Sequence, residues 1–570
     1  MKFYLIGING RFVHSSLGLL YVRQQLLRHL PQCTCLLLER TINDPYYDIF
    51  CEAAADDAAA VFLSAYVWNA HMVARLALDL ARLLPCLPVI IGGPQARYLF
   101  PPDRAPATLS VVLGEVEGLS SSFYQDIRTG TLAPLYQAEP AQQFSLPFLD
   151  QDIVTHFLRR NIYYEGSRGC PFRCSYCLSA RDTGVRLLAV GQVCRDLDRL
   201  LDQGAKRIRF VDRTFNLDPE RTLAIWRHIQ QRTRGDRNTT FHFEMAPDRF
   251  TDAMFHFLQQ APPGLFEFEL GIQSTNQTVL AGIDRVIDLR RSLANIRTLA
   301  GLATVHLHVD LILGLPFEDE TSFLASFTQV FFLGAHQIQM GLLKVLPDTP
   351  LANQADGWGI VRMSHPPYEV TETRWLEHGR LAHLYHFGNC VELFHNNRWF
   401  VSIWRYLREK KIDPVPLFQR LARMRRETGT AGLGQEALSG MLSKALSSVV
   451  VDEDLCRELL VYDWLATGHQ FLPEHLATKE TTLAGMKRQL GRRLPQALDR
   501  TYDAHSRDEF FKTTLFYPFS RKAASFLLGA EQQCVLAFAA ERADNLFRLQ
   551  KVLVFVDNER TDGFFQGREK

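Results

Sequence analysis

Two series of short apolar runs, each alternating with amphipathic stretches, dominate the first 350 residues. The runs of the first series are FYLIGI, CTCLLLE, AVFLSAY, PVIIGG and LSVVLGE. Continuous apolar runs are typical of strands buried on both faces, and their alternation with helices indicates an α/β fold with a parallel, doubly wound (Rossmann-like) sheet. Ligands bind such sheets at the carboxyl ends of the strands. The polar, glycine and proline residues expected there are Asn9, Ser64, Gly92, Gly93, Pro94, Gly114 and Glu115.

The second series supplies six further strand–helix units between residues 161 and 346. Its runs are NIYYEGS, KRIRFVD, TTFHFEM, LFEFELGIQ, TVHLHVDLILG and HQIQMGLLKVL. Six units are fewer than the eight that close a full (β/α) barrel, so we expect a partial barrel. Its active site would again lie at the carboxyl ends of the strands.

These patterns divide the chain into four parts. We expect a doubly wound domain over residues 1–135 and a proline-containing linker over 136–155. The partial barrel would occupy residues 156–362, and a mainly helical domain residues 363–570. Within the last part, VLVFVDNE is the one stretch interpreted as a strand.

Composition excludes several broad classes of protein. The formal net charge is +1, so no global field favours nucleic acid or an anionic membrane. No run reaches the roughly 18 apolar residues of a membrane span. The N-terminal MKFYLIGING does not resemble a signal peptide, so we expect a cytoplasmic protein. Disulfides are not expected among the 11 cysteines in that compartment.

Three cysteines, Cys170, Cys174 and Cys177, lie close together after the first strand of the second series. Three thiolates on one short loop can bind three irons of a cubane cluster. Iron–sulfur clusters are normally held by four cysteines, so one iron would stay open to an outside ligand, such as the amino and carboxylate groups of a methionine moiety. The alternatives are chance and structural zinc, which needs four closed ligands. No fourth candidate lies nearby, since Cys194 is in a helical stretch.

The spacing C-x3-C-x2-C, with an aromatic residue before the third cysteine, resembles the radical S-adenosylmethionine (radical SAM) superfamily over residues of about 156 to 350. The resemblance implies a 4Fe–4S cluster on the three cysteines. Reduction of the cluster, by a donor such as flavodoxin or ferredoxin, would cleave S-adenosylmethionine to a 5′-deoxyadenosyl radical. The resemblance also implies that S-adenosylmethionine contacts Tyr176 (adenine), Asp212 (methionine moiety), Glu244 (ribose) and the fourth-strand motif with Gln273 and Ser274.

The first domain resembles the cobalamin-binding module of the cobalamin-dependent radical SAM subclass. The matching segments are residues 64–69, 91–94 and 114–115. Other cobalamin domains carry Asp-x-His-x-x-Gly, with the histidine on cobalt, whereas this chain has Phe12 and Leu17 around His14. Three roles stay open for His14: a cobalt ligand, a neighbour of the corrin that does not bond cobalt, or plain structure. The rival interpretation is a domain that has lost its cofactor. A nicotinamide site is less consistent, because no G-x-G-x-x-G follows the first strand.

Residues 340–351 and 365–370 resemble a subfamily in which a domain of unknown function is appended to a cobalamin-type radical protein. The pairing of the two cofactors implies transfer of a methyl group from methylcobalamin to an unactivated carbon of an unknown substrate. The alternatives are a radical rearrangement, cyclisation or oxidation without methylation, and a non-catalytic sensor of redox state or cobalamin.

Overall fold

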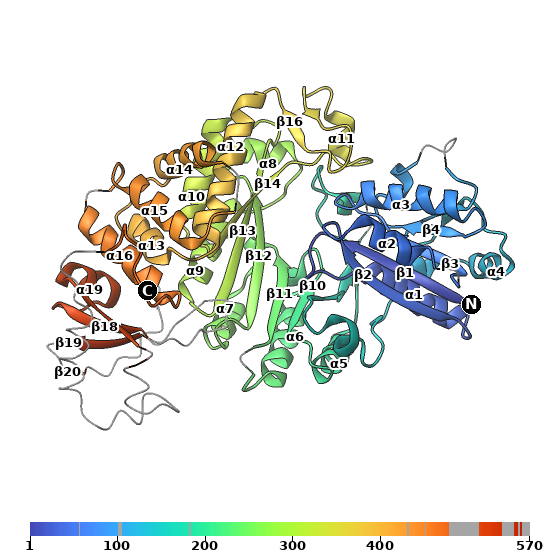
Figure 1. The fold of residues 1–570 in the computed structure, drawn as a ribbon, viewed down its shortest axis with the longest axis horizontal. Coiled ribbons are helices and arrows are strands. Elements are labelled where there is room, and N and C mark those ends of the chain that lie inside the picture. The colour runs from blue at the N-terminus through green and yellow to red at the C-terminus, as the bar shows by residue number, and fades with distance from the viewer. Residues whose placement is uncertain are drawn as a thin grey trace. The chain divides into compact units, whose positions relative to one another are not determined.

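The structure is a computed structural model. It describes residues 1–55, 57–100, 105–181, 184–236, 238–429, 432–450, 452–477, 512, 514–538, 552–556 and 559–560. The chain forms two compact units, one of residues 1–244 and 344–370 and the other of residues 245–343 and 371–570 (Figure 1). Each unit is described separately below.

The first unit begins with a six-stranded parallel sheet in the order β2-β1-β3-β4-β5-β6. Its strands are β1 (Lys2–Asn9), β2 (Thr34–Thr41), β3 (Ala60–Ser64), β4 (Val89–Gly92), β5 (Leu109–Leu113) and β6 (Leu135–Gln137). The five predicted strands are confirmed, and their order reverses between β1 and β3, which makes the carboxyl ends of these two strands a topological switch point. The short β6, which the sequence did not predict, spans the domain boundary expected at residue 135.

Helices cover both faces of this sheet (Figure 1). They are α1 (Leu17–His29), α2 (Tyr46–Ala53), α3 (Ala70–Leu83) and α4 (Ser121–Thr129). α2 packs beside α3, and α1 beside α4. The central strands are apolar throughout because both of their faces are buried: every residue of β3 is buried, and so is nearly all of β1.

The first unit also holds three parallel strands of the second series, in the order β11-β10-β7. These strands are β7 (Ile162–Tyr164), β10 (Arg207–Phe210) and β11 (Thr240–Met245). Helices α5 (Val190–Asp202) and α6 (Pro219–Arg232) follow β7 and β10, and Asp218 caps α6 by accepting the N–H groups of Glu220 and Arg221. The unit also contains four small elements: the antiparallel pair β8 (Ser167–Arg168) and β9 (Arg186–Leu187), helix α11 (Pro350–Gln354) and strand β15 (Val361–Arg362).

The second unit holds the other three predicted strands, again parallel, in the order β14-β13-β12. They are β12 (Phe266–Gln273), β13 (Val305–Leu313) and β14 (Gln337–Leu342). The accompanying helices are α7 (Asp252–Gln259), α8 (Gln277–Gly282), α9 (Leu289–Gly301) and α10 (Glu320–Phe331). All six strands of the second series are therefore confirmed, three in each unit.

The C-terminal region is mainly helical, as predicted. Its helices are α12 (His378–Cys390), α13 (Val401–Glu409), α14 (Val415–Thr428), α15 (Gln435–Leu446), α16 (Glu453–Ala466) and α19 (Arg521–Leu528). It also contains β16 (Val370–Glu372) and an antiparallel sheet of β17 (Leu515–Phe519), β18 (Cys534–Phe538), β19 (Val552–Val556) and β20 (Glu559–Arg560). The sequence predicted only β19 of that sheet.

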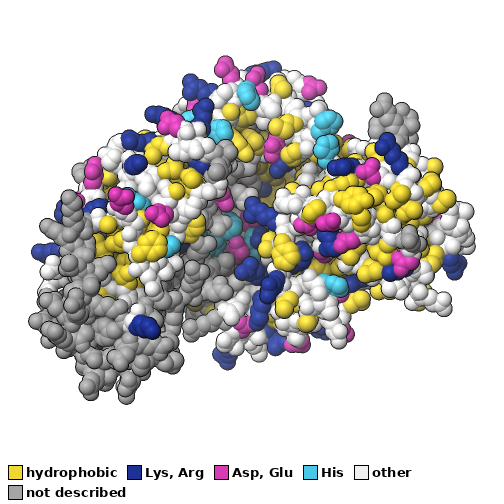
Figure 2. All heavy atoms as spheres, viewed as in Figure 1, with side chains coloured by type: hydrophobic (Ala, Val, Ile, Leu, Met, Phe, Trp, Pro, Cys, Tyr) yellow, Lys and Arg dark blue, Asp and Glu magenta, His cyan; other side chains and the backbone are white. Residues whose placement is uncertain are grey.

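No helix among the described residues has the length and apolar character needed to cross a membrane. On the face drawn in Figure 2, basic and acidic side chains are interspersed, in keeping with the net charge of +1.

Candidate functional site

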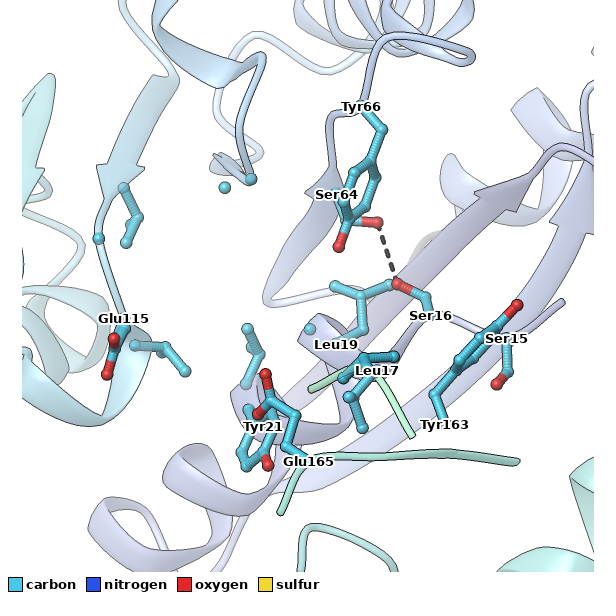
Figure 3. Close-up of a pocket in the computed structure, with 18 of the residues that line it drawn as sticks. Ser15, Ser16, Leu17, Leu19, Tyr21, Ser64, Tyr66, Glu115, Tyr163 and Glu165 are labelled. Carbon is cyan, nitrogen blue, oxygen red and sulfur yellow. Dashed lines mark hydrogen bonds between the residues drawn. The ribbon is translucent and has the colours of Figure 1, made fainter. Parts of the chain in front are cut away.

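A cavity of about 890 Å³ opens at the carboxyl edge of the first sheet, within the first unit (Figure 3). It spans the switch point, because Asn9 ends β1 and Ser64 ends β3. Of the predicted cofactor-binding residues, the cavity is lined by Asn9, His14, Ser64, Gly92, Gly93, Gly114 and Glu115. Pro94 is not part of the lining, although it follows Gly93 directly.

Two of the lining glycines have backbone conformations that other residues rarely adopt. Gly93 has φ of +100°, and a Cβ atom there would lie 2.6 Å from the carbonyl oxygen of Ala65. Gly114 has φ of +89°, and a Cβ atom would lie 2.7 Å from the carbonyl oxygen of Ala138. The glycines predicted to let a ligand approach the backbone are therefore also required by the turns themselves.

A buried polar cluster lies where β1 and β3 end. The side-chain amide of Asn9 donates to Glu39 (2.5 Å), and the backbone N–H of Ser16 donates to the other oxygen of the same carboxylate (3.0 Å). The hydroxyl groups of Ser16 and Ser64 lie 3.1 Å apart and point toward one another (Figure 3). Burial raises the pKa of Glu39, although both of these donors oppose the shift. Sequence reasoning missed Glu39, because it lies within the apolar run of β2.

A network of ion pairs in the cavity lining connects the end of the first sheet to the start of the cysteine-bearing loop. The guanidinium of Arg168 forms ion pairs with Glu115 (2.8 Å), Glu117 (2.7 Å) and Glu165 (2.8 Å). Arg186 forms a further ion pair with Glu115. Burial alone would raise the pKa of Glu115, but Arg186 and Arg168 outweigh it and hold that pKa below its ordinary value. Glu115 therefore acts as the ionised partner of two arginines.

His14 contacts Tyr163 of β7 across the cavity wall, with 2.5 Å between Nδ1 and the phenol oxygen. Burial lowers the pKa of His14, and the charges of Arg209 and Arg11 add to the shift, so the imidazole is neutral at pH 7. Burial raises the pKa of Tyr163, while a side-chain hydrogen bond with Asn161 opposes the shift, as a donor to the phenol oxygen does. Tyr163 is thus the hydrogen-bond partner of the Nδ1 atom of His14.

The segment around His14 is also bonded to the chain that enters β7. The backbone N–H of Asn161 donates to the carbonyl oxygen of Val13 (2.7 Å), and the Ser15 hydroxyl donates to the carbonyl oxygen of Asn161 (3.1 Å). Arg160 donates to the carbonyl oxygen of His14 (2.8 Å). Hydrogen bonds therefore connect the loop after β1 to the chain segment that enters β7.

The loop that carries the three cysteines is held by buried charges at its start. The Asp212 carboxylate accepts the backbone N–H of Gly166 (2.8 Å) and the hydroxyl of Ser167 (2.7 Å). Arg221 of α6 donates to the carbonyl oxygen of Gly166 (3.0 Å). Burial raises the pKa of Asp212 to about 6, against the opposing effect of these donors and of Arg221. At this point Asp212, predicted to lie beside a methionine moiety, positions the cysteine loop.

The thiols themselves occupy a tight turn after that anchor. Gly169 precedes Cys170 with φ of +90°, and the backbone N–H of Cys177 donates to the carbonyl oxygen of Cys174 (3.0 Å). Cys174 is buried, Cys170 and Cys177 are half-buried, and none of the three forms a disulfide bond. Burial raises the pKa of Cys170, so its thiolate form needs a positive partner such as a metal.

The number of these thiols fits a cluster better than a single zinc ion, because structural zinc needs four closed ligands. Three cysteines on one loop, none in a disulfide bond, match the donor set of a cubane cluster with one open iron.

The structure brings the remaining predicted residues to the places expected from their strands. Tyr176 is half-buried within the cysteine turn. Glu244 lies near the end of β11, 3.8 Å from Arg213. In the second unit, Gln273 ends β12 with φ of +75°, and the buried hydroxyl of Ser274 donates to Glu318 (2.6 Å). Residues that the sequence did not single out complete the cavity, including Tyr21, Tyr66, Tyr163, Glu165, Arg168 and Arg186.

Comparison with known families identifies two segments of the chain. Residues 164–329 match the Radical SAM superfamily. Residues 356–535 match a protein family of unknown function, DUF4080. The first match begins at the last residue of β7 and covers the cysteine motif and the strands β10, β11, β12 and β13.

Two curated relatives are methyltransferases. The chain is 23% identical over 428 residues to 2-(S-pantetheinyl)-carbapenam-3-carboxylate methyltransferase of Streptantibioticus cattleyicolor, covering 65% of this chain and 62% of that protein. It is 26% identical over 335 residues to the cobalamin-dependent radical SAM methyltransferase TokK of Streptomyces tokunonensis, covering 51% of this chain and 47% of that protein. The chain thus spans less than two thirds of the length of either relative.

A solved structure extends the likeness to most of the chain. The cobalamin-dependent S-adenosylmethionine radical enzyme OxsB, in its apo form, superposes with a TM-score of 0.53 at 13% identity, covering 86% of this chain and 75% of that one. OxsB with aqua-cobalamin bound gives a TM-score of 0.50 at 14% identity. At this identity the likeness concerns the fold. The chain therefore contains a segment that matches the Radical SAM superfamily and a segment that matches DUF4080, and a cobalamin-dependent radical SAM methyltransferase is among its relatives.

Proposed function

We propose that this chain is a cobalamin-dependent radical SAM methyltransferase that acts on an unactivated carbon. One observation carries the proposal: the cavity at the switch point of the first sheet is lined by Ser167, Arg168 and Gly169, the residues that lead directly into Cys170. A ligand in the cavity would thus border the loop that carries the cysteines. The relative TokK is described as cobalamin-dependent, and OxsB has been solved with aqua-cobalamin bound.

The cavity fits a large, partly polar cofactor. Its volume lies in the upper part of the range of about 300–1,000 Å³ that is usual for ligand sites. Gly92, Gly93 and Gly114 are part of the lining, while Leu17, Leu19 and Tyr66 supply apolar wall (Figure 3). We propose that a corrin lies in this cavity with its nucleotide tail against the glycines.

Cys170, Cys174 and Cys177 would hold a 4Fe–4S cluster, and Asp212 would fix the loop so that the three thiols converge. When bound, the cluster supplies the electron that splits S-adenosylmethionine, and cobalamin supplies a carrier for the methyl group. Tyr176, Glu244, Gln273 and Ser274 remain our candidates for contacts to S-adenosylmethionine. We expect an external one-electron donor of the flavodoxin or ferredoxin type.

The cluster assignment is tested by anaerobic reconstitution with iron, sulfide and cobalamin. Under strong reductant, the wild-type protein should convert S-adenosylmethionine to 5′-deoxyadenosine. The Cys174→Ala variant should lose the cluster absorption and this activity together. Cys390→Ala is the matched control, since Cys390 is equally buried but lies in α12. Retention of both signals in Cys174→Ala would refute the assignment.

Methyl transfer is tested separately from radical formation, and the first readout needs no substrate. With bound cobalamin held reduced, the wild-type protein should convert S-adenosylmethionine to S-adenosylhomocysteine, whereas protein without cobalamin should not. Once a substrate is found, turnover should yield both S-adenosylhomocysteine and 5′-deoxyadenosine. Formation of 5′-deoxyadenosine alone would favour a rearrangement, cyclisation or oxidation. Absence of any cleavage under strong reductant would favour the non-catalytic sensor.

A further inference from the structure

We infer that Glu267, His306 and His308 form a binding site for a divalent transition-metal ion in the second unit, separate from the cysteine loop. One ligand atom from each residue lies within 4.8 Å of the other two. Two imidazoles and one carboxylate are a donor set that zinc and ferrous iron both use in proteins. Neither the family matches nor the predicted cofactors require this site.

The parallel pairing of β12 and β13 brings the three side chains together. Glu267 and His306 are directly opposite one another in the register of the two strands. His308 follows His306 by two residues, so both imidazoles project from the same face of β13. On β12, Glu267 alternates with the buried Phe266 and Phe268, which places its carboxylate on the opposite face from those rings. The three ligands therefore share one face of a rigid sheet.

The distances are close to those of a tetrahedral site. The Oε1 atom of Glu267 lies 2.8 Å from Nε2 of His308 and 3.9 Å from Nδ1 of His306. Tetrahedral coordination with bonds of about 2.0–2.1 Å separates ligand atoms by about 3.3 Å. Shifts of a few tenths of an ångström in each side chain would bring these two pairs of atoms to that separation.

Burial adds a second reason to expect a cation. His306 is 2% exposed, and the side chains of Glu267 and His308 are each 13% exposed. A carboxylate with so little access to water needs a paired charge or a metal ion. The alternative is a simple buried Glu267–His308 ion pair, but such a pair does not explain why the second imidazole faces the same oxygen.

His336 packs beside the proposed site, but its Nδ1 atom is not available as a fourth ligand. Its ring stacks on that of His306, with 5.0 Å between centroids, and its Nδ1 accepts the backbone N–H of Leu307 (3.1 Å). This hydrogen bond to the main chain fixes the ring of His336, and the stacking restricts the ring of His306. Packing of this kind orients metal ligands in proteins.

The site lies at the amino-terminal ends of its strands. Glu267 is the second residue of β12, and His306 is the second residue of β13. Gln273, at the carboxyl end of β12, is six residues farther along, which corresponds to about 20 Å. The metal would therefore link β12 to β13 at the end of the strands remote from Gln273 and Ser274.

The experiment measures metal uptake by the full-length reconstituted protein, with cluster content checked by absorbance. The protein is incubated with Zn²⁺ or, anaerobically, with Fe²⁺, desalted, and analysed for zinc and iron. Wild type should retain one zinc per chain, or one iron beyond those of the cluster, whichever ion the site prefers. His308→Gln and the conservative Glu267→Gln should each lose that equivalent while keeping the cluster absorption.

His228→Gln is the matched control, because Nε2 of His228 lies 3.0 Å from Asp198 with no second imidazole in the pair. His228→Gln should keep the extra metal equivalent. Addition of Zn²⁺ or Fe²⁺ should raise the melting temperature of wild type and of His228→Gln, but not that of His308→Gln. Failure of wild type to retain either ion, or equal retention by all variants, would overturn the inference. Neither readout depends on cobalamin or on methyl transfer, so the result for this metal site is independent of the result for the proposed function.

Discussion

The carboxylate of Asp212 accepts the backbone N–H of Gly166, four residues before the first cysteine of the motif. The same carboxylate accepts the hydroxyl of Ser167 through its other oxygen. A buried charge that follows β10 therefore fixes the backbone from which the cysteine turn departs. Two such hydrogen bonds to an ionised acceptor are stronger than neutral ones.

We expect Asp212→Asn to lower the iron content of the reconstituted protein and to reduce 5′-deoxyadenosine formation at least tenfold. An amide offers one acceptor oxygen, and its NH₂ group would face one of the two donors. Iron and sulfide analysis measures the first effect. Asp196→Asn is the control, since Asp196 is a buried carboxylate bonded to Tyr164 and Gln192 instead of the loop. An unchanged cluster in Asp212→Asn would contradict the positioning role.

Replacement of Arg168 by methionine should destabilise the protein by about 3–5 kcal/mol, the usual cost of removing one partner from a buried ion pair. Arg168 is 9% exposed at its side chain and balances Glu115, Glu117 and Glu165. Urea unfolding, followed by circular dichroism, measures the loss. Arg199→Met removes an exposed ion pair with Asp150 and should cost less than about 1 kcal/mol. Similar losses in the two variants would show that burial of Arg168 has no energetic weight.

Cobalamin bound in the cavity should not receive a nitrogen ligand from His14. If the phenol O–H of Tyr163 donates to Nδ1, the proton of the neutral imidazole lies on Nε2, and neither nitrogen is then free to bond cobalt. The electron paramagnetic resonance spectrum of bound cob(II)alamin should therefore lack nitrogen splitting from the protein. His14→Gln should leave that spectrum unchanged. A nitrogen triplet that disappears in His14→Gln would instead assign His14 as the ligand.

Glu318 should make stability fall as the pH rises. Burial raises its pKa to about 8, although the Ser274 hydroxyl donates to it and opposes the shift. Between the ordinary pKa of about 4.3 and about 8, the folded protein thus holds a proton that the unfolded chain has released, so stability decreases over this range and levels off above it. Glu318→Gln should remove this dependence. The urea midpoint of the variant minus that of wild type should therefore increase between pH 5 and pH 9. A difference that is independent of pH would contradict the shift.

Local sequence patterns predicted the strands and the cysteine motif, because these features depend on residues that are close together in the chain. The strands of both series are continuous apolar runs, and the cysteine spacing lies within eight residues, so both were found without knowledge of the fold. The strand-end positions of Asn9, Ser64 and Gly93 followed from the rule that parallel sheets bind ligands at their carboxyl edge.

Contacts made by distant residues could not be found in this way. Tyr163 is an unremarkable residue of a short strand until the fold brings it to His14, 149 residues earlier. Glu267 and His306 become neighbours only through the register of β12 with β13. The three-residue β6 has too few residues to show a periodicity, and it exists because it pairs with β5.

The bonds between Val13, Ser15 and Asn161 have a consequence for how the protein responds to a ligand. The loop after β1 lines the cavity, and the segment bonded to it at Asn161 continues through β7 toward Cys170. We expect an occupant that orders residues 11–16 also to slow the local opening of residues 160–163, since the two segments share these hydrogen bonds. Hydrogen exchange at the amide of Asn161, which donates to Val13, thus reports occupancy of the cavity before any cluster is built and without knowledge of the substrate.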